Sequence, residues 1–153
     1  MGRIELDSPY EGAFEGGTHH FAVRIYYEDT DAAGIVYYAN YLRFMERARS
    51  EMLRSLGIDQ RAMLDAGTGA YAVARIEVDY RASARLDDAI LVLSKVQRIR
   101  AAACVIHQRV MRGRELLAEA VVTVAFVSPG GRPQRQPRDW VKAFEKLKGE
   151  ASE

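Results

Sequence analysis

The sequence is poor in the residues that build disulfide scaffolds and metal clusters. It has one cysteine, four prolines, three histidines and one tryptophan in 153 residues. The single cysteine, Cys104, excludes an internal disulfide framework and any metal site built from several cysteines. It fits a reducing compartment, and its setting in AACVIH is typical of a buried strand thiol. No apolar run approaches the roughly 20 residues that a membrane-spanning helix needs, so we expect no transmembrane segment.

An excess of charge of one sign is also absent. Lysine and arginine number 22 against 21 aspartates and glutamates, which gives a formal net charge of +1. This balance provides no general attraction to nucleic acid or to an acidic membrane, so any anion must be bound locally. The first residues, MGRIELDSPYEG, lack the basic and apolar regions of a secretory signal, and we expect a cytoplasmic protein.

Length and composition predict one folded domain. The chain is 48% hydrophobic and 28% charged, which is ordinary for a globular protein and disfavours disorder. Residues 1–18 are rich in Gly, Glu and Asp and predict a loose N-terminal arm that contributes little to the core. We therefore expect a single domain over residues 19–148.

The periodicity of apolar residues changes along the chain. HHFAVRIYY predicts a strand at about 19–27, followed by the turn formers EDTD. A helical stripe then predicts a long helix over 38–56, with apolar positions at steps of three and four: Tyr38, Tyr41, Leu42, Met45, Ala48, Met52 and Leu56. Gly57 is placed to end it, and Asp59 to cap a short second helix that reaches Ala66.

The second half of the sequence reads as strands. ARIEVDYR at 74–81 alternates apolar and polar residues, and further strands are expected at about 89–100, 102–112 and 115–127, with a hairpin at Gly113. A short helix over 138–149 closes the chain. A long helix followed by a run of strands predicts an α+β domain in which a curved antiparallel sheet of about five strands covers one helix. Its open edges invite pairing with a second copy.

The stretch EDTDAAGIVYYANYLRF, residues 28–44, combines acid with the start of the long helix. Asp31 lies at the junction, and the small residues Ala32, Ala33 and Gly34 would let a substrate approach the backbone. A helix beginning near Tyr38 leaves unpaired N–H groups that can polarise a carbonyl oxygen. Asp31 could then attack the carbonyl carbon or deprotonate a water, which points to acyl transfer to water.

Two other interpretations of these residues stay open. The acidic residues can simply form a turn and cap a helix. A metal site is less favoured because no recognised ligand spacing joins the residues it would need: Glu28, Asp29 and Asp31 with His19 or His20. His107, within a strand pattern, reads as a packed or hydrogen-bonded residue. No nucleophile elbow, P-loop or dinucleotide fingerprint is found, and we expect no metal or other cofactor.

The segment YYEDTDAAGIVYYANYLRFMERARSEML closely resembles the signature of hotdog-fold thioesterases of the 4-hydroxybenzoyl-CoA thioesterase family. Within that family it is most similar to the tol-pal system-associated acyl-CoA thioesterase branch. IEVDYRASARLDDAI and LLAEAVVTVAFVSP resemble the same branch, so the resemblance covers roughly residues 20–145. It implies a hotdog fold, one long helix wrapped by a strongly curved antiparallel sheet, that forms homodimers by joining sheets and often homotetramers.

The resemblance also implies roles for three residues. Asp31 matches the catalytic carboxylate, and the backbone N–H of Tyr38 matches the group that polarises the thioester carbonyl. Tyr27 matches a tyrosine proposed to assist in the branch. The branch commonly carries histidine where this sequence has Tyr38, so only a backbone role is expected there.

Candidate substrate-binding residues follow from the same comparison. Gly34, Val36 and Tyr41 are expected to bind the substrate. Tyr41 and Phe44 can line the acyl pocket or equally be core residues. The phosphates of coenzyme A require cations, and the candidates are Arg81, Arg85, Arg98 and Arg100. Arginines that alternate along a strand are also common on solvated faces.

The function expected from these observations is hydrolysis of an acyl-CoA thioester, or of an acyl carrier protein thioester, to the free acid and the thiol. The alternative is a non-catalytic hotdog protein that binds acyl-CoA or acyl carrier protein as a sensor or scaffold. Asp31 argues against the alternative, because a binder has no need of a carboxylate beside an anionic ligand. The sequence leaves open the acyl chain length, the carrier, dimer or tetramer, and nucleophilic or general-base attack.

Overall fold

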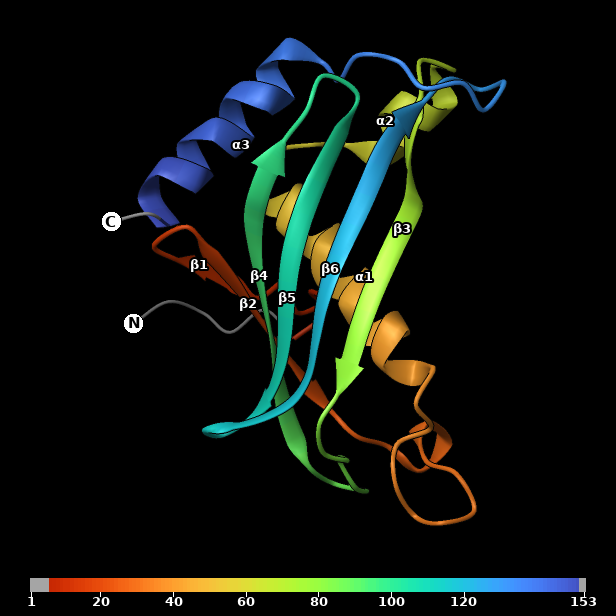
Figure 1. Ribbon diagram of the computed structural model, residues 1–153, viewed down its shortest axis with the longest axis vertical. Coiled ribbons are helices and arrows are strands. Elements are labelled where there is room, and N and C mark those ends of the chain that lie inside the picture. The colour runs from red at the N-terminus through yellow and green to blue at the C-terminus, as the bar shows by residue number, and fades with distance from the viewer. Residues whose placement is uncertain (1–5, 152–153) are drawn as a thin grey trace.

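The structure is a computed structural model that describes residues 6–151 (Figure 1). One sheet contains six strands: β1 (Ala13–Glu15), β2 (Thr18–Arg24), β3 (Ala70–Tyr80), β4 (Ala89–Ile99), β5 (Ala103–Arg112) and β6 (Glu115–Val127). The helices are α1 (Asn40–Ser55), α2 (Gln60–Asp65) and α3 (Arg138–Ala151), and a 3₁₀ turn, η1, spans Tyr27–Asp29. Within the described residues no helix is long and apolar enough to cross a membrane.

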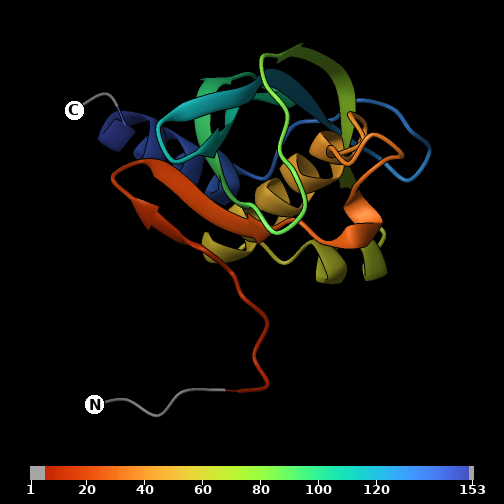
Figure 2. The same ribbon diagram turned by 90° about the horizontal axis from the view of Figure 1, so that it is seen from below.

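The sheet is antiparallel, with strand order β1-β2-β4-β5-β6-β3. Strands β4, β5 and β6 form a meander whose β5–β6 hairpin turns at Gly113, as the sequence predicted. β2 pairs with the outer side of β4, and β3 with the outer side of β6. The chain between β2 and β3 contains α1, which therefore crosses the concave face that the curved sheet encloses (Figure 2).

The core lies between α1 and the inner face of the sheet. Alternate residues of β4, β5 and β6 are buried, as expected for strands with one covered face. From α1 the buried apolar residues are Tyr41, Phe44, Met45, Ala48, Met52 and Leu53. Most of the predicted helical stripe is therefore confirmed as the face that packs on the sheet.

A polar clamp, which we define as Arg49, Gln108 and Ser94, joins α1 to β5 and β4 inside this core. Gln108 is fully buried; its Oε1 accepts from Arg49 Nη1 at 3.0 Å. Its Nε2 donates to the Met45 carbonyl at 3.0 Å and to Ser94 Oγ at 2.9 Å. Because every polar atom of the Gln108 amide has a partner, the clamp fixes the helix on the sheet without leaving that amide unsatisfied.

The N-terminal boundary differs from the expectation of a loose arm over residues 1–18. Residues 13–15 form β1, which pairs with β2, and the Phe14 side chain packs against the core. The chain turns at Gly12, whose φ of +72° and close approach to the His20 carbonyl leave no room for a Cβ. The arm was misread because a three-residue strand beside glycines has too short a pattern to detect. β1 also raises the strand number from five to six.

Other elements match with shifted ends. The first strand stops at Arg24 rather than 27, because Tyr27–Asp29 turns into η1. α1 begins at Asn40, two residues after the predicted start, and β3 begins at Ala70, four residues before it. The Asp59 cap is confirmed by its Oδ1, which accepts from the Ala62 N–H at 2.9 Å.

Candidate active site

The acidic turn folds back on itself between β2 and α1. The Tyr37 N–H donates to the Asp29 carbonyl at 3.0 Å, and the Asp31 N–H donates to the Ile35 carbonyl at 2.8 Å. Gly34 closes the turn, since its N–H donates to the Asp31 carbonyl at 3.0 Å and its φ is +79°. A left-handed conformation at this position favours glycine, and the absence of a side chain leaves the space beside Asp31 open.

Asp31 is exposed and lies where two hollows meet. Its Oδ1 accepts from the Ala33 N–H at 2.9 Å, a turn contact that orients the carboxyl group. Within residues 6–151 the other oxygen, Oδ2, has no hydrogen-bond partner. Asp31 therefore keeps one oxygen available for a reacting group.

The start of α1 supplies an unpaired donor. The Asn40 N–H donates to the Tyr37 carbonyl at 2.8 Å, and Asn40 Nδ2 donates to the Asp29 carbonyl at 2.9 Å. Ala39, at the N-cap, makes no side-chain cap. In the described part of the chain the Tyr38 N–H meets no acceptor. An unpaired N–H just ahead of a helix is suited to bind a carbonyl oxygen or an anion.

The first hollow, which we call the Asp31 groove, brings these groups together. It has a volume of about 310 Å³ and is lined by Asp31, Ile35, Val36, Tyr38, Tyr41, Tyr80, Arg81, Ala82 and Ser83. Its floor is formed by two largely apolar side chains, Val36 and Tyr41, which are each only 2% exposed. Asp31, Tyr38 and one arginine, Arg81, thus border a single groove with an apolar base.

The loop at 81–88 lines the Asp31 groove with its first residues and is held by hydrogen bonds in its middle and at its C-terminal end. The Ala84 N–H donates to Tyr41 Oη at 2.9 Å, and the Val36 N–H donates to the Ala84 carbonyl at 2.9 Å. Asp88 Oδ2 accepts from the Arg85 N–H at 2.8 Å and from Arg112 Nη1 at 2.7 Å. The bond from the Arg85 backbone contributes most, the bond from Arg112 next, and together they hold the pKa of Asp88 below its usual range.

The remaining predicted site residues divide into three groups. Tyr27, which is 82% exposed, and Gly34 line the second hollow, of about 470 Å³, on the other side of Asp31. Phe44 is 1% exposed and belongs to the core. Arg85, whose backbone bridges to Ile35, is exposed and lines neither hollow.

Two further arginines lie far from the acidic turn. Arg98 and Arg100 are at the end of β4, whereas the Asp31 groove is bordered by the loop that precedes β4. Eleven residues of strand separate the two ends of β4, a span of roughly 35 Å. Within one chain they therefore lie apart from the Asp31 groove and from Arg81.

The metal interpretation finds no support in the geometry around the histidines. His19 is fully buried in β2, and its Nε2 lies 3.1 Å from the Glu11 carbonyl, which requires that nitrogen to be the protonated donor. Burial lowers the pKa of His19. His20 Nε2 lies 3.8 Å from Glu15 Oε2. Among the described residues no three His, Cys, Asp or Glu side chains gather in a way that could hold a metal ion.

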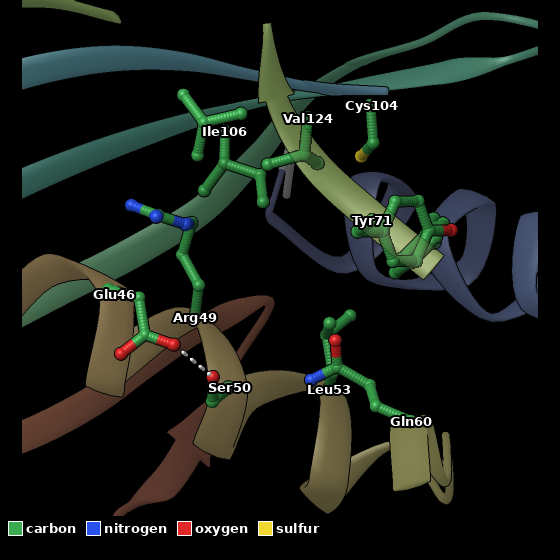
Figure 3. A pocket seen from close by; sticks show the side chains of 11 residues that line it. Glu46, Arg49, Ser50, Leu53, Gln60, Tyr71, Cys104, Ile106 and Val124 are labelled. Atoms are coloured by element: carbon green, nitrogen blue, oxygen red, sulfur yellow. Dashed lines mark hydrogen bonds between the residues drawn. The ribbon is translucent and has the colours of Figure 1, made fainter. Parts of the chain in front are cut away.

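A separate pocket of about 110 Å³ opens beside the C-terminal half of α1 (Figure 3). Its buried wall includes Cys104, Ile106 and Phe144, and burial raises the pKa of the Cys104 thiol to about 12. At its mouth Ser50 Oγ donates to Glu46 Oε1 at 3.0 Å. It shares no lining residue with either hollow at Asp31, and we assign it no part in the site.

Sequence reasoning missed part of the Asp31 groove. Tyr80 and Ser83 line it from the end of β3 and the loop that follows. Both read as ordinary strand-end and loop residues, and a single sequence carries no signal that the end of β3 returns to the start of α1, some 40 residues earlier. The approach of these residues to the start of α1 is visible only in the three-dimensional structure.

A curved antiparallel sheet wrapped around a central helix, with a carboxylate in the turn that precedes the helix, defines a hotdog-fold protein with a candidate hydrolytic site. The sequence profile of the Thioesterase-like superfamily matches residues 25–144. The chain belongs to this superfamily. The family expected from the signature at residues 26–53 is therefore confirmed.

Relatives and solved structures agree with this assignment. The chain is 43% identical over 129 residues to the protein named acyl-CoA thioesterase YbgC of Haemophilus influenzae, a match that covers 84% of this chain and 95% of the relative. It is 42% identical to acyl-CoA thioester hydrolase YbgC of Escherichia coli, over 80% of this chain and 92% of the relative. A probable thioesterase from Bartonella henselae superposes with a TM-score of 0.75 at 31% identity, covering 78% and 99% of the two chains.

A more distant structure supports the fold alone. The complex of a mutant 4-hydroxybenzoyl CoA thioesterase with 4-hydroxybenzoyl CoA superposes with a TM-score of 0.75 at 21% identity. The match covers 84% of this chain and 99% of the other. The expected hotdog architecture is confirmed by this superposition together with the strand order of the sheet.

Proposed function

We propose that this protein is an acyl-CoA thioesterase that hydrolyses a thioester to a free acid and coenzyme A. The observation that carries the proposal is the Asp31 groove, which is lined both by Asp31, with a free carboxylate oxygen, and by Tyr38, with an unpaired backbone N–H. The 43% identity to a named acyl-CoA thioesterase supports the same activity.

In the proposed reaction the Tyr38 N–H donates to the thioester oxygen. Negative charge grows on that oxygen when the carbonyl carbon becomes tetrahedral, and a fixed donor stabilises it by an amount typical of oxyanion sites, about 3–4 kcal/mol. The donor comes from the backbone, so Tyr38, at a position where the tol-pal branch commonly carries histidine, keeps this role.

Asp31 supplies the second role. As general base it takes a proton from water while the water oxygen bonds to the carbonyl carbon; the C–S bond then breaks and the coenzyme A thiolate leaves and is protonated. As nucleophile its own oxygen forms that bond, the thiolate leaves, and water hydrolyses the resulting anhydride. Both routes need the same free carboxylate oxygen in the same place.

Other residues are proposed to surround the reacting group. Val36 and Tyr41 form an apolar floor for the first carbons of the acyl group, and Gly34 leaves room for the thioester beside Asp31. Arg81, exposed at the rim, is the cation suited to meet a phosphate of coenzyme A. Tyr27, in the adjoining hollow, is suited to contact the attacking water or the leaving group.

We also propose that the protein assembles through its sheet and acts in the cytoplasm. β3 is an 11-residue strand at the edge of the sheet with most residues exposed, and such an edge pairs readily with another strand. We therefore expect a homodimer or homotetramer in which a second copy covers this edge. Acyl carrier protein thioesters are the alternative carrier for the same chemistry.

The test is release of thiol from short, long and aryl acyl-CoAs by the wild type, Asp31→Asn and Asp29→Asn. The Asp31→Asn amide keeps the acceptor for the Ala33 N–H but is neither base nor nucleophile, so kcat should fall at least about a hundredfold. Asp29→Asn is the matched control, because its carboxylate bonds the Tyr26 N–H and faces neither hollow. Unchanged activity in Asp31→Asn refutes the mechanism, and intact thioesters with every protein favour the binding or scaffold alternative.

A further inference from the structure

Tyr80 lines the Asp31 groove and contacts Tyr38, the residue that supplies the proposed oxyanion donor. It is the last residue of β3, and its hydroxyl donates to the Tyr38 carbonyl at 3.1 Å. Its ring centroid lies 5.9 Å from that of Tyr38 and 5.7 Å from that of Tyr41, in edge-to-face arrangements. Tyr80 is 44% exposed, so its hydroxyl contact is made at the edge of solvent rather than in the core.

The backbone around Tyr38 depends on few contacts. The Tyr37 carbonyl, in the same peptide unit as the Tyr38 N–H, accepts from the Asn40 N–H at 2.8 Å. The Tyr38 carbonyl accepts from the Tyr41 N–H at 3.3 Å, which is long for a hydrogen bond, and from Tyr80. Among the described residues Tyr80 is the only side chain bonded to the backbone of Tyr38.

We propose that Tyr80 is a positioning residue for the reaction: its hydroxyl fixes the Tyr38 backbone to the end of β3, so that the Tyr38 N–H stays directed into the Asp31 groove. The inference rests on the proposed function. It gives the edge strand a part in catalysis, since β3 holds the start of α1 in place. The Tyr80 ring also closes one side of the groove beside Tyr41.

The hydroxyl can serve throughout the neutral pH range. Burial, and then the neighbouring Tyr38 and Tyr41, raise the pKa of Tyr80 above that of an ordinary tyrosine, so the group stays protonated and donates. A donor that is correctly aimed lowers the energy of the transition state more than that of the bound substrate, because the charge it meets is larger there. The loss of Tyr80's hydroxyl should therefore appear in kcat rather than in KM.

The decisive variant is Tyr80→Phe, which keeps the ring contacts and removes only the hydroxyl. One lost hydrogen bond corresponds to roughly a three- to tenfold change, so kcat should fall by about that factor with KM nearly unchanged. Tyr71→Phe is the matched control, because Tyr71 lies on the same strand and its hydroxyl donates to Gln136 Oε1 at 2.6 Å, away from the groove. The control should lower thermal stability and leave kcat and KM at their wild-type values.

Thiol release and amide hydrogen exchange are measured on all three proteins. Support consists of a lower kcat, unchanged KM and faster exchange at residues 38–41 in Tyr80→Phe alone. An unchanged kcat, a rise in KM alone, or equal losses in both variants overturns the positioning role. Failure of the proposed function is distinguishable: then the wild type releases no thiol, whereas failure of this inference leaves wild-type hydrolysis and its loss in Asp31→Asn intact.

Discussion

Replacing Gln108 with leucine should weaken the attachment of α1 to the sheet and so lower the stability of the fold. The substitution preserves bulk at a fully buried position and removes three hydrogen bonds of the polar clamp. Arg49 is only 8% exposed, and its Nη1 then loses its hydrogen-bond acceptor. A buried charge without its partner is costly because water cannot replace the lost bond.

The magnitude follows from the bonds removed. A hydrogen bond to a charged group contributes about 1.5–3 kcal/mol and a neutral one about 1 kcal/mol. Gln108→Leu should therefore lower the free energy of unfolding by about 3.5–5 kcal/mol, and the melting temperature by roughly 10–15 °C for a domain of this size. Arg49→Met alone should cost less, about 1–2 kcal/mol, because it strands only one neutral oxygen.

The assay is urea denaturation at one fixed protein concentration, with both single variants and the double variant. In Arg49→Met/Gln108→Leu the charge and its acceptor disappear together, so the double variant should be more stable than the sum of the singles implies by at least about 1 kcal/mol. Strict additivity of the two losses would refute the clamp as an energetic unit. It would mean that each side chain contributes through packing alone.

The remaining predictions concern two buried titratable groups. Burial lowers the pKa of His19, so the folded chain binds its proton more weakly than the unfolded chain; stability should be full above about pH 6.5 and decline as the pH falls below it, less so in His19→Gln, as measured by urea midpoints between pH 8 and 5. A pH dependence identical in the two proteins would contradict this. Burial raises the pKa of Cys104 to about 12, so the folded protein should not react with a thiol dye at pH 8 and should react fully in denaturant, and fast labelling of the native protein would show that the thiol is accessible.

Patterns that repeat along the chain were readable from the sequence. The strands β4, β5 and β6 and the stripe of α1 were predicted within a few residues, because alternation and helical spacing persist over ten or more positions. β1 was missed because three residues cannot establish a period. Its pairing with β2 depends on the turn at 16–17, and that turn resembles any glycine-rich arm.

The site could be predicted only where its residues are close together in the sequence. Asp31 and Tyr38 were found together because the acidic turn leads directly into the helix, and the structure places both in the Asp31 groove. Tyr80 was missed since it reaches the groove from another strand. Arg81 and Arg85 looked equivalent in sequence, yet only Arg81 lines the groove, and one sequence carries no signal that distinguishes them.

The strand order also constrains how the chain folds during synthesis. β2 pairs with residues 89–95 and β3 with residues 118–127, so both strands that flank α1 in sequence find their partners only later in the chain. While residues 81–127 are being made, roughly a few seconds at ordinary translation rates, the apolar stripe of α1 has no sheet to cover it. The local hairpins of β4, β5 and β6 close short loops and form quickly, whereas enclosing the helix requires long loops to close. The nascent protein is thus most vulnerable to aggregation and proteolysis just before its last strand emerges.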